Sequence, residues 1–174
     1  MATADVYPRE FKAPDDGRVL VIDRASLKNN NEVGDFVKQH FMAILPNHVL
    51  IPYFESRSEE ARPFLTAYKN LFLENQTVSL TVKDNFSTMV AIVVNRIHHR
   101  SCHQENNSIL KRQLPIFELL KALNRHINLF DRYKTEKVLH LEMVAVRSDY
   151  CRLGLATELL KLSIEIGRAN GAGA

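Results

Sequence analysis

The chain has 174 residues, of which 45% are hydrophobic and 25% are charged, and its formal net charge is +3. This length fits one ordinary domain over residues 1–174, and the composition excludes a disordered chain. The lysines and arginines are scattered along the sequence, which argues against nucleic acid as a partner. No signal-peptide pattern and no run of about eighteen apolar residues occurs, so we expect a cytoplasmic protein without a membrane span.

The first part of the chain predicts a strand, two helices and a hairpin. The apolar run Gly17–Asp23 predicts the first strand. Apolar residues at helical spacing predict helices over Asn31–Ile44 and from Ser58 to Phe72, with a packed loop between them. The hairpin pairs Val78–Val82 with Thr88–Val94, and the second of these strands is apolar on both faces. We therefore expect that strand to lie centrally, covered by helices on each side of the sheet.

The second part predicts helices, a long strand and a final helix. A helical region runs from Asn106 to Leu129, and Asp131–Lys137 forms a polar link. The strand Val138–Val146 follows, then a turn with Gly154 and a helix to about residue 168. This order predicts an α/β protein with a mixed sheet, part antiparallel and part parallel. The last long strand calls for a parallel neighbour after the helix, so we expect the natural chain to continue past its final residue.

The turn between the last strand and the last helix carries small residues, Gly154 and Ala156, beside Arg152. Small side chains leave the backbone N–H groups of a helix N-terminus uncovered, and such groups attract phosphate. A glycine required only by the steric demands of the turn would give the same pattern. The turn alone therefore leaves anion binding and a purely structural glycine as alternatives.

The longer string around this turn resembles a known motif. Residues Leu141–Val146 followed by Asp149–Ala156 resemble the acetyl-CoA-binding motif of the GNAT acetyltransferases, in which Arg or Gln is followed by two residues, Gly, one residue, and Gly or Ala. Gly154 and Ala156 fit this motif, whereas Cys151 stands where Arg or Gln is usual. Residues 125–133 also resemble the segment that precedes this strand in insect arylalkylamine N-acetyltransferases.

The resemblance implies the GNAT fold, a central mixed sheet flanked by helices, and acetyl transfer from the co-substrate acetyl-CoA to a small primary amine of the arylalkylamine kind. It also implies that the backbone of the last strand binds the pantetheine arm and that the following turn binds the pyrophosphate. The expected binding residues are Met143, Val144, Ala145 and Val146 on the strand, and Cys151, Arg152, Leu153, Gly154, Leu155, Ala156 and Thr157 in the turn.

The general base is predicted to be Glu142. An amine is mostly protonated near neutral pH, so a base has to take its proton before the nitrogen can attack. Glu142 interrupts an apolar strand, and a two-residue period would place it on one face with His140, Val144 and Val146. The alternative is a solvated carboxylate near an opening of the sheet. For His140, a hydrogen-bonded core histidine is the favoured interpretation over a proton shuttle.

The resemblance implies another base as well, because insect arylalkylamine N-acetyltransferases commonly carry a glutamate just before a proline at the end of the first helix. The matching position here is Leu45, before Pro46. Either Glu142 substitutes, or a chain of water molecules does, or the substrate differs from the common arylalkylamines. An acetyltransferase for a non-aromatic or protein amine, and an acyl-CoA-binding domain without activity, therefore stay open as alternatives. The oligomeric state is left open.

A cluster of His98, His99, Cys102 and His103 has the composition of a metal site. All four residues fall within six positions of one predicted loop, without a second ligand pair at suitable spacing. We therefore predict a solvated loop and no metal. Cys102 and Cys151 are expected to be free thiols.

Overall fold

The computed structural model describes residues 7–14, 16–26, 30–41, 77–102, 122 and 127–173. The predicted loop at 45–54, the helix at 58–72 and most of the helical region at 106–129 lie outside this set. Among the described residues, no helix has both the length and the apolar character needed to cross a membrane.

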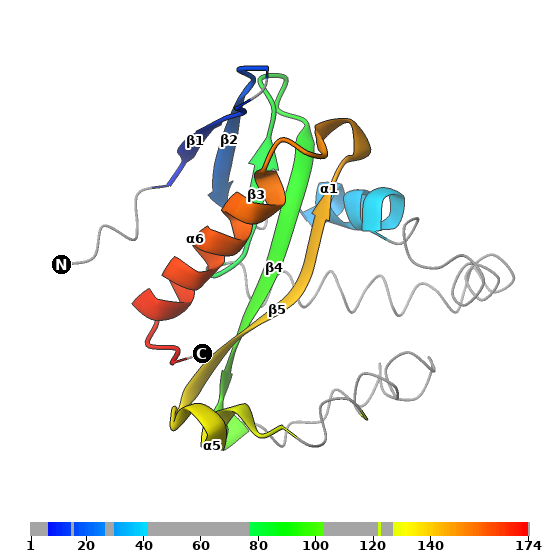
Figure 1. Ribbon diagram of the computed structural model, residues 1–174. Coiled ribbons are helices and arrows are strands. Elements are labelled where there is room, and N and C mark those ends of the chain that lie inside the picture. The colour runs from blue at the N-terminus through cyan, green and yellow to red at the C-terminus, as the bar shows by residue number, and fades with distance from the viewer. Residues whose placement is uncertain are drawn as a thin grey trace, which may run out of the picture.

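The described elements form a five-stranded sheet with helices on both faces (Figure 1). The strands are β1 (Arg9–Lys12), β2 (Val19–Arg24), β3 (Leu80–Lys83), β4 (Met89–His99) and β5 (Lys137–Val146). The helices are α1 (Asn30–Phe36), continued by a π-helical turn over Val37–Phe41, then α5 (Leu129–Tyr133) and α6 (Leu155–Ala169). Two 3₁₀ turns cover Arg100–Cys102 and Ser148–Tyr150.

The strand order follows the sequence, β1-β2-β3-β4-β5, and all four strand pairs are antiparallel. The predicted first strand, hairpin and last long strand are confirmed as β2, β3–β4 and β5. The parallel part of the predicted mixed sheet involves β5 and a further strand beyond Ala174, and that pairing stays a prediction. Because β5 is the last strand in the order, it has β4 on one side and forms an edge of the sheet that these residues build.

Strand β4 lies between the two layers of the core, as its apolar sequence predicts. Val90 and Val93 belong to the buried cluster under α6, whereas Met89, Ile92 and Val94 belong to the cluster under α1. We call these two sides of the sheet the α6 face and the α1 face. Side chains that alternate along β4 are therefore buried on both faces, and this excludes solvent from the centre of the sheet.

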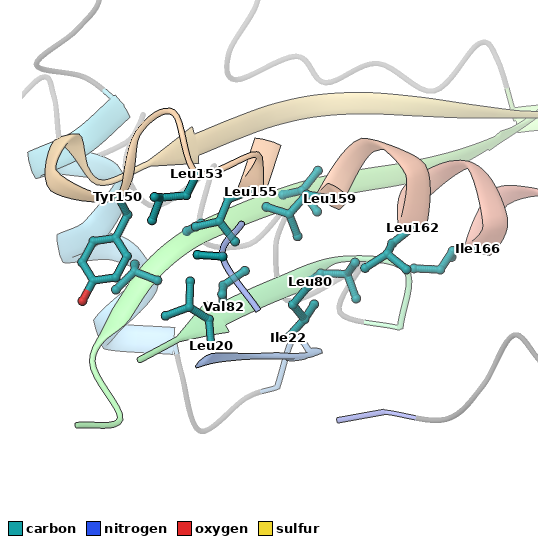
Figure 2. Packing of buried hydrophobic residues seen from close by; sticks show 14 of the residues in the cluster. Leu20, Ile22, Leu80, Val82, Tyr150, Leu153, Leu155, Leu159, Leu162 and Ile166 are labelled. Carbon is teal, nitrogen blue, oxygen red and sulfur yellow. The ribbon is translucent and has the colours of Figure 1, made fainter. Parts of the chain in front are cut away.

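Helix α6 packs on the sheet through one apolar stripe (Figure 2). Leu155, Leu159, Leu162 and Ile166 recur every three or four residues and are each at most 2% exposed. Burial of each such side chain contributes on the order of 1.5–3 kcal/mol. Near the end of the helix a Cβ on Gly167 would lie 3.0 Å from Leu139 Cδ2, so glycine allows α6 to approach β5 closely there. The stripe and this close approach set the position of the helix over β4 and β5.

Two elements differ from the sequence prediction. Strand β1 was not predicted, because its sequence Arg-Glu-Phe-Lys has a single apolar residue and alternates between half-buried and exposed positions. Helix α5 occupies part of the predicted polar link. The side chain of Asn128 accepts hydrogen bonds from the backbone N–H groups of Phe130 and Asp131, at 3.1 and 3.3 Å, and so caps this short helix.

Candidate functional site

Strand β5 contains a bulge at Glu142. The strand pairing joins Val94 to Met143 but the next residue, Asn95, to Leu141, so Glu142 is the extra residue on β5. A bulge of this kind bends the strand and changes the direction of its side chains. Bulges are frequent beside active sites, because they redirect a side chain without ending the strand.

The bulge changes which residues share a face with Glu142. Leu141, Val144 and Val146 pack on the α6 face, although regular alternation would place Leu141 opposite the two valines. Met143 and Ala145 belong to the α1 face. The prediction that Glu142 lies on one face with His140, Val144 and Val146 is therefore wrong for the two valines. It assumed an unbroken two-residue period.

Two imidazoles meet the carboxylate of Glu142. His140 Nδ1 lies 3.2 Å from Glu142 Oε1, and His98 Nε2 lies 3.8 Å from the same oxygen. The two histidine rings are tilted by 63° to each other, with centroids 5.5 Å apart. The side chain of Glu142 is 21% exposed, that of His98 32% and that of His140 51%. These three side chains form a half-buried cluster that solvent and a small ligand can reach.

These positions correct two sequence predictions. His140 is not a core histidine, because half of its side chain is exposed and its partner is a carboxylate. His98 and His99 do not lie in a loop, because β4 continues through both of them. His98 therefore contacts residues that follow it by more than forty positions in the sequence. The side chains of Cys102 and His103 lie outside the described residues.

The charges of this cluster are coupled. Burial raises the pKa of Glu142, but the hydrogen bond from His140, the polar contact with His98 and the positive charges of the two imidazoles outweigh burial and hold the pKa at about 2. The hydrogen bond to Glu142 raises the pKa of His140 above its usual 6.5, against the opposing effects of burial and of the Arg96 charge. Glu142 is therefore ionised near neutral pH, and a proton that enters the cluster resides on an imidazole.

The turn after β5 is anchored by Tyr150. Its hydroxyl donates a hydrogen bond of 3.1 Å to Oδ2 of the buried Asp84, whose other oxygen caps the β3–β4 turn. Arg147 makes two hydrogen bonds to Asp149, at 2.7 and 3.0 Å, and its guanidinium lies 4.6 Å from the centre of the Tyr150 ring. Together these contacts hold the turn against the end of the sheet.

The turn then enters α6 through Gly154, which precedes the helix with a φ of +83°. This left-handed conformation favours glycine. Gly154 provides no side-chain hydrogen bond to the start of the helix, and the first helical hydrogen bond runs from Glu158 N–H to the Gly154 carbonyl. Leu153 and Leu155 are buried and fix the turn, whereas Cys151 and Arg152 are exposed. Within the described residues, the N-terminus of α6 therefore presents N–H groups without a side-chain cap beside the exposed, positively charged Arg152.

The same end of β5 offers backbone groups at the edge where no described strand pairs with it. Arg147 N–H donates to the Val90 carbonyl at 2.9 Å. Because hydrogen-bonded residues alternate along an antiparallel strand, Met143 and Ala145 also direct their backbone groups to β4. Val144 and Val146 direct theirs away from β4, to the edge of the sheet. Of the four strand residues predicted to bind the pantetheine arm, Val144 and Val146 are thus the two whose backbone N–H and C=O groups point away from β4.

The structure thus brings most of the predicted site residues to one end of β5. Residues 147–150 join the edge of Val144 and Val146 to the turn of residues 151–157, and Glu142 lies two residues before Val144, where it contacts His98 and His140. Leu45, where the resemblance places another base, lies outside the described residues. His98 was missed, because its contact with Glu142 depends on strand pairing. Its even spacing from Ile92 and Val94 on one strand could have indicated that His98 lies on the same face of the sheet as these two residues.

Sequence and structure comparisons agree on this architecture. Residues 119–174 match the model of the acetyltransferase (GNAT) family. No curated protein is similar enough in sequence to be matched to this chain.

Several solved structures share the fold. One is assigned as arylalkylamine N-acetyltransferase 7 of the mosquito Aedes aegypti, with a TM-score of 0.73 and 18% identity over 98% of this chain and 74% of that one. Arylalkylamine N-acetyltransferase 2 of Aedes aegypti aligns with a TM-score of 0.63 and 22% identity over 87% of this chain and 72% of that one. The polyamine N-acetyltransferase of Drosophila melanogaster, which forms N-acetylagmatine, has a TM-score of 0.63 and 15% identity over 88% and 72% of the two chains. The chain therefore has the GNAT fold.

Proposed function

We propose that this chain, with its GNAT fold and its match to that family over residues 119–174, is an N-acetyltransferase that transfers the acetyl group of acetyl-CoA to a small primary amine of the arylalkylamine kind. The observation that carries the proposal is the junction of β5 and α6. There, among the described residues, a strand edge without a neighbouring strand is followed, after the turn of residues 147–154, by a helix N-terminus without a side-chain cap.

The residues of this junction fit acetyl-CoA. A pyrophosphate matches the N–H groups and positive dipole end at Leu155, Ala156 and Thr157, and the exposed Arg152 supplies a further charge. The amides of a pantetheine arm match the outward N–H and C=O groups of Val144 and Val146, as an added strand would. The thiol of the exposed Cys151 lies near the carbonyls of Val146 and Arg147. We therefore expect Cys151 to contact the co-substrate through its backbone rather than through its side chain. Leu153 fixes the turn from within the core.

Acetyl-CoA supplies the acetyl group as a thioester, and the chain has to orient the amine and take up its proton. We assign the proton uptake to Glu142, which stands on the same strand as the edge that binds the co-substrate. Its carboxylate accepts the amine proton directly or through one water molecule and passes it to the imidazole of His140, 3.2 Å away, where the proton then resides. The nitrogen then forms its bond to the carbonyl carbon, the carbon–sulfur bond breaks, and the second proton that the nitrogen loses goes to the departing CoA thiolate, which leaves as the thiol.

Two observations support an arylalkylamine as the substrate: the activities of similar solved structures and a sequence resemblance. One of the similar solved structures is an arylalkylamine N-acetyltransferase, a second is assigned to that group, and residues 125–133 resemble the same group. A second candidate is a non-aromatic amine, because other solved relatives acetylate polyamines or agmatine. The test is acetylation of a panel containing arylalkylamines, polyamines and agmatine by the purified chain. Because the exposed Cys151 would react with thiol reagents, the acetylated amine is measured by mass spectrometry.

We expect the highest kcat/KM with an arylalkylamine. A preference for agmatine or a polyamine would move the proposal to the second candidate. Binding of acetyl-CoA without acetylation of any amine would instead indicate an acyl-CoA-binding domain and overturn the proposed activity.

A further inference from the structure

We propose that His98, His140 and Glu142 form a binding site for a divalent first-row transition metal ion, best matched by Zn²⁺. This site is additional to the proposed acetyl-CoA junction and lies on the α1 face of β4 and β5. Ion binding itself does not depend on the proposed function. Its consequence for acetyl transfer does, because the ion would occupy the carboxylate to which we assign proton uptake.

The spacing of the ligand atoms fits an ion. Nδ1 of His140 and Nε2 of His98 lie 3.2 and 3.8 Å from Oε1 of Glu142, and all three atoms lie within 4.8 Å of one another. Around a tetrahedral Zn²⁺ with bonds of about 2.0–2.2 Å, ligand atoms are separated by roughly 3.4 Å. The two nitrogen–oxygen separations, 3.2 and 3.8 Å, lie on either side of this value, so the spacing of each imidazole from the carboxylate matches that of ligands on one ion.

Hydrogen bonding accounts for only part of this arrangement. The 3.2 Å contact of His140 with Glu142 is an ordinary hydrogen bond, whereas 3.8 Å from His98 exceeds the usual range of about 2.7–3.2 Å. His98 nevertheless directs a ring nitrogen at the oxygen that His140 already uses. Convergence of two ring nitrogens and one carboxylate oxygen around a common point is the ligand set of many zinc and iron sites.

The scaffold holds these ligands in place. The pairing of β4 with β5 sets Arg96 opposite His140 and His98 opposite Val138, so the backbone positions of the three ligands are fixed by one strand pair. At the bulge, Glu142 contacts both His140 and His98. With 21–51% of each side chain exposed, the site is open enough for water or a substrate atom as a fourth ligand.

The site differs from the metal cluster that the sequence excludes. That cluster joined neighbouring residues of one segment, including His99. Here His98 is combined with two residues of β5, and His99 lies on the opposite side of β4 because side chains alternate along a strand. His99 therefore provides a matched control, since it is the same residue type at the next position on the same strand.

The test is a titration of the purified full chain, without an affinity tag and freed of metal by EDTA and dialysis, with Zn²⁺ in competition with a chromophoric zinc indicator. We expect about one equivalent of bound Zn²⁺ per chain. His98→Asn should weaken Zn²⁺ binding at least about 10-fold, because loss of a residue that only supports a metal ligand already costs that much. His99→Asn should bind Zn²⁺ like wild type. Circular dichroism in EDTA checks that both variants are folded.

Absence of stoichiometric binding by wild type, or equal affinity of the two variants, would overturn the proposal. A second measurement compares acetyl transfer in Zn²⁺ with transfer in EDTA for each protein. We expect wild type and His99→Asn to be inhibited reversibly and His98→Asn to lose the inhibition. Because the titration uses neither acetyl-CoA nor an amine, failure of the proposed transferase activity leaves its result unaffected.

Discussion

At the scale of single residues, Glu142 combines partial burial with two imidazole neighbours that keep it ionised. Glu142→Gln keeps the shape of the side chain but removes its basicity, and general-base assistance contributes about 10²- to 10⁴-fold in rate. We expect turnover to fall by that factor in EDTA, with acetyl-CoA affinity nearly preserved. The loss should be partly rescued at high pH, where more of the amine is already deprotonated.

The control for this variant is Glu136→Gln, because the Glu136 side chain is 80% exposed and Glu136 lies just before β5, at the end of the strand away from the co-substrate turn. It should turn over like wild type. If Glu142→Gln also did so at every pH, Glu142 would be structural, and the base would have to be sought elsewhere.

The His140–Glu142 pair also predicts a pH dependence of stability. The raised pKa of His140 contributes stability that is fully present below 6.5 and is lost as pH rises through the folded-state pKa. The lowered pKa of Glu142 contributes stability that is present above 4.5 and is lost as pH falls toward about 2. The pair therefore stabilises the fold most between these limits.

We accordingly expect His140→Gln to lower the free energy of unfolding more at about pH 5.5 than at about pH 8.5, as measured by urea denaturation in EDTA. His99→Gln should show no such difference between the two pH values. A pH-independent effect of His140→Gln would indicate that packing, rather than the ion pair, is lost.

At the scale of elements, the start of α6 depends on the backbone of Gly154. A Cβ there would lie 4.0 Å from Phe11 Cζ, so space is available, but a φ of +83° strains any β-branched residue. Gly154→Val should therefore reduce stability and also weaken acetyl-CoA binding, because it distorts the N–H groups that face the pyrophosphate. Isothermal titration calorimetry measures the affinity.

Gly171 offers the matched control, since its φ is +78°, no atom lies within 4 Å of its Cβ position, and it follows the other end of α6. Gly171→Val carries a similar backbone strain and should retain acetyl-CoA affinity. Equal affinities of the two variants would remove the helix N-terminus from the binding site.

The sequence predicts the elements whose apolar patterns are continuous. The β3–β4 hairpin, β5 and α6 were expected because their side chains alternate or recur with a regular period over most of their length. The bulge at Glu142 was not predictable from β5 alone, because a bulge is a property of the register between two strands. The contact of His98 with Glu142 follows from the same register and was missed for the same reason.

At the scale of the whole molecule, the two halves of the candidate site are tied together by buried polar groups. Asn95 Nδ2 donates to the Val78 carbonyl at 2.9 Å and to Ser163 Oγ at 2.8 Å, and so connects β4 to the segment before β3 and to α6. Ser163 Oγ in turn donates to the Leu159 carbonyl at 2.8 Å. Asn95 pairs with Leu141, directly beside the bulge. This network therefore fixes α6, which starts at the co-substrate turn, relative to the segment of β5 that carries Glu142.

Asn95→Ala would leave the Val78 carbonyl and the Ser163 hydroxyl without this partner in a region that is at most 6% exposed. Unsatisfied buried groups and the cavity together should lower the free energy of unfolding by about 2–4 kcal/mol. Ser163→Ala removes the bond from Asn95 and the bond to the Leu159 carbonyl, but Asn95 keeps its bond to Val78, so the cost should be smaller, about 1–2 kcal/mol. Urea denaturation measures both values, and the reverse order would mean that Asn95 does not organise the network.

If Asn95 holds the two halves of the candidate site in place, Asn95→Ala should also lower kcat more than it weakens acetyl-CoA binding. The reason is that the helix N-terminus persists in this variant, while its distance to Glu142 is no longer fixed.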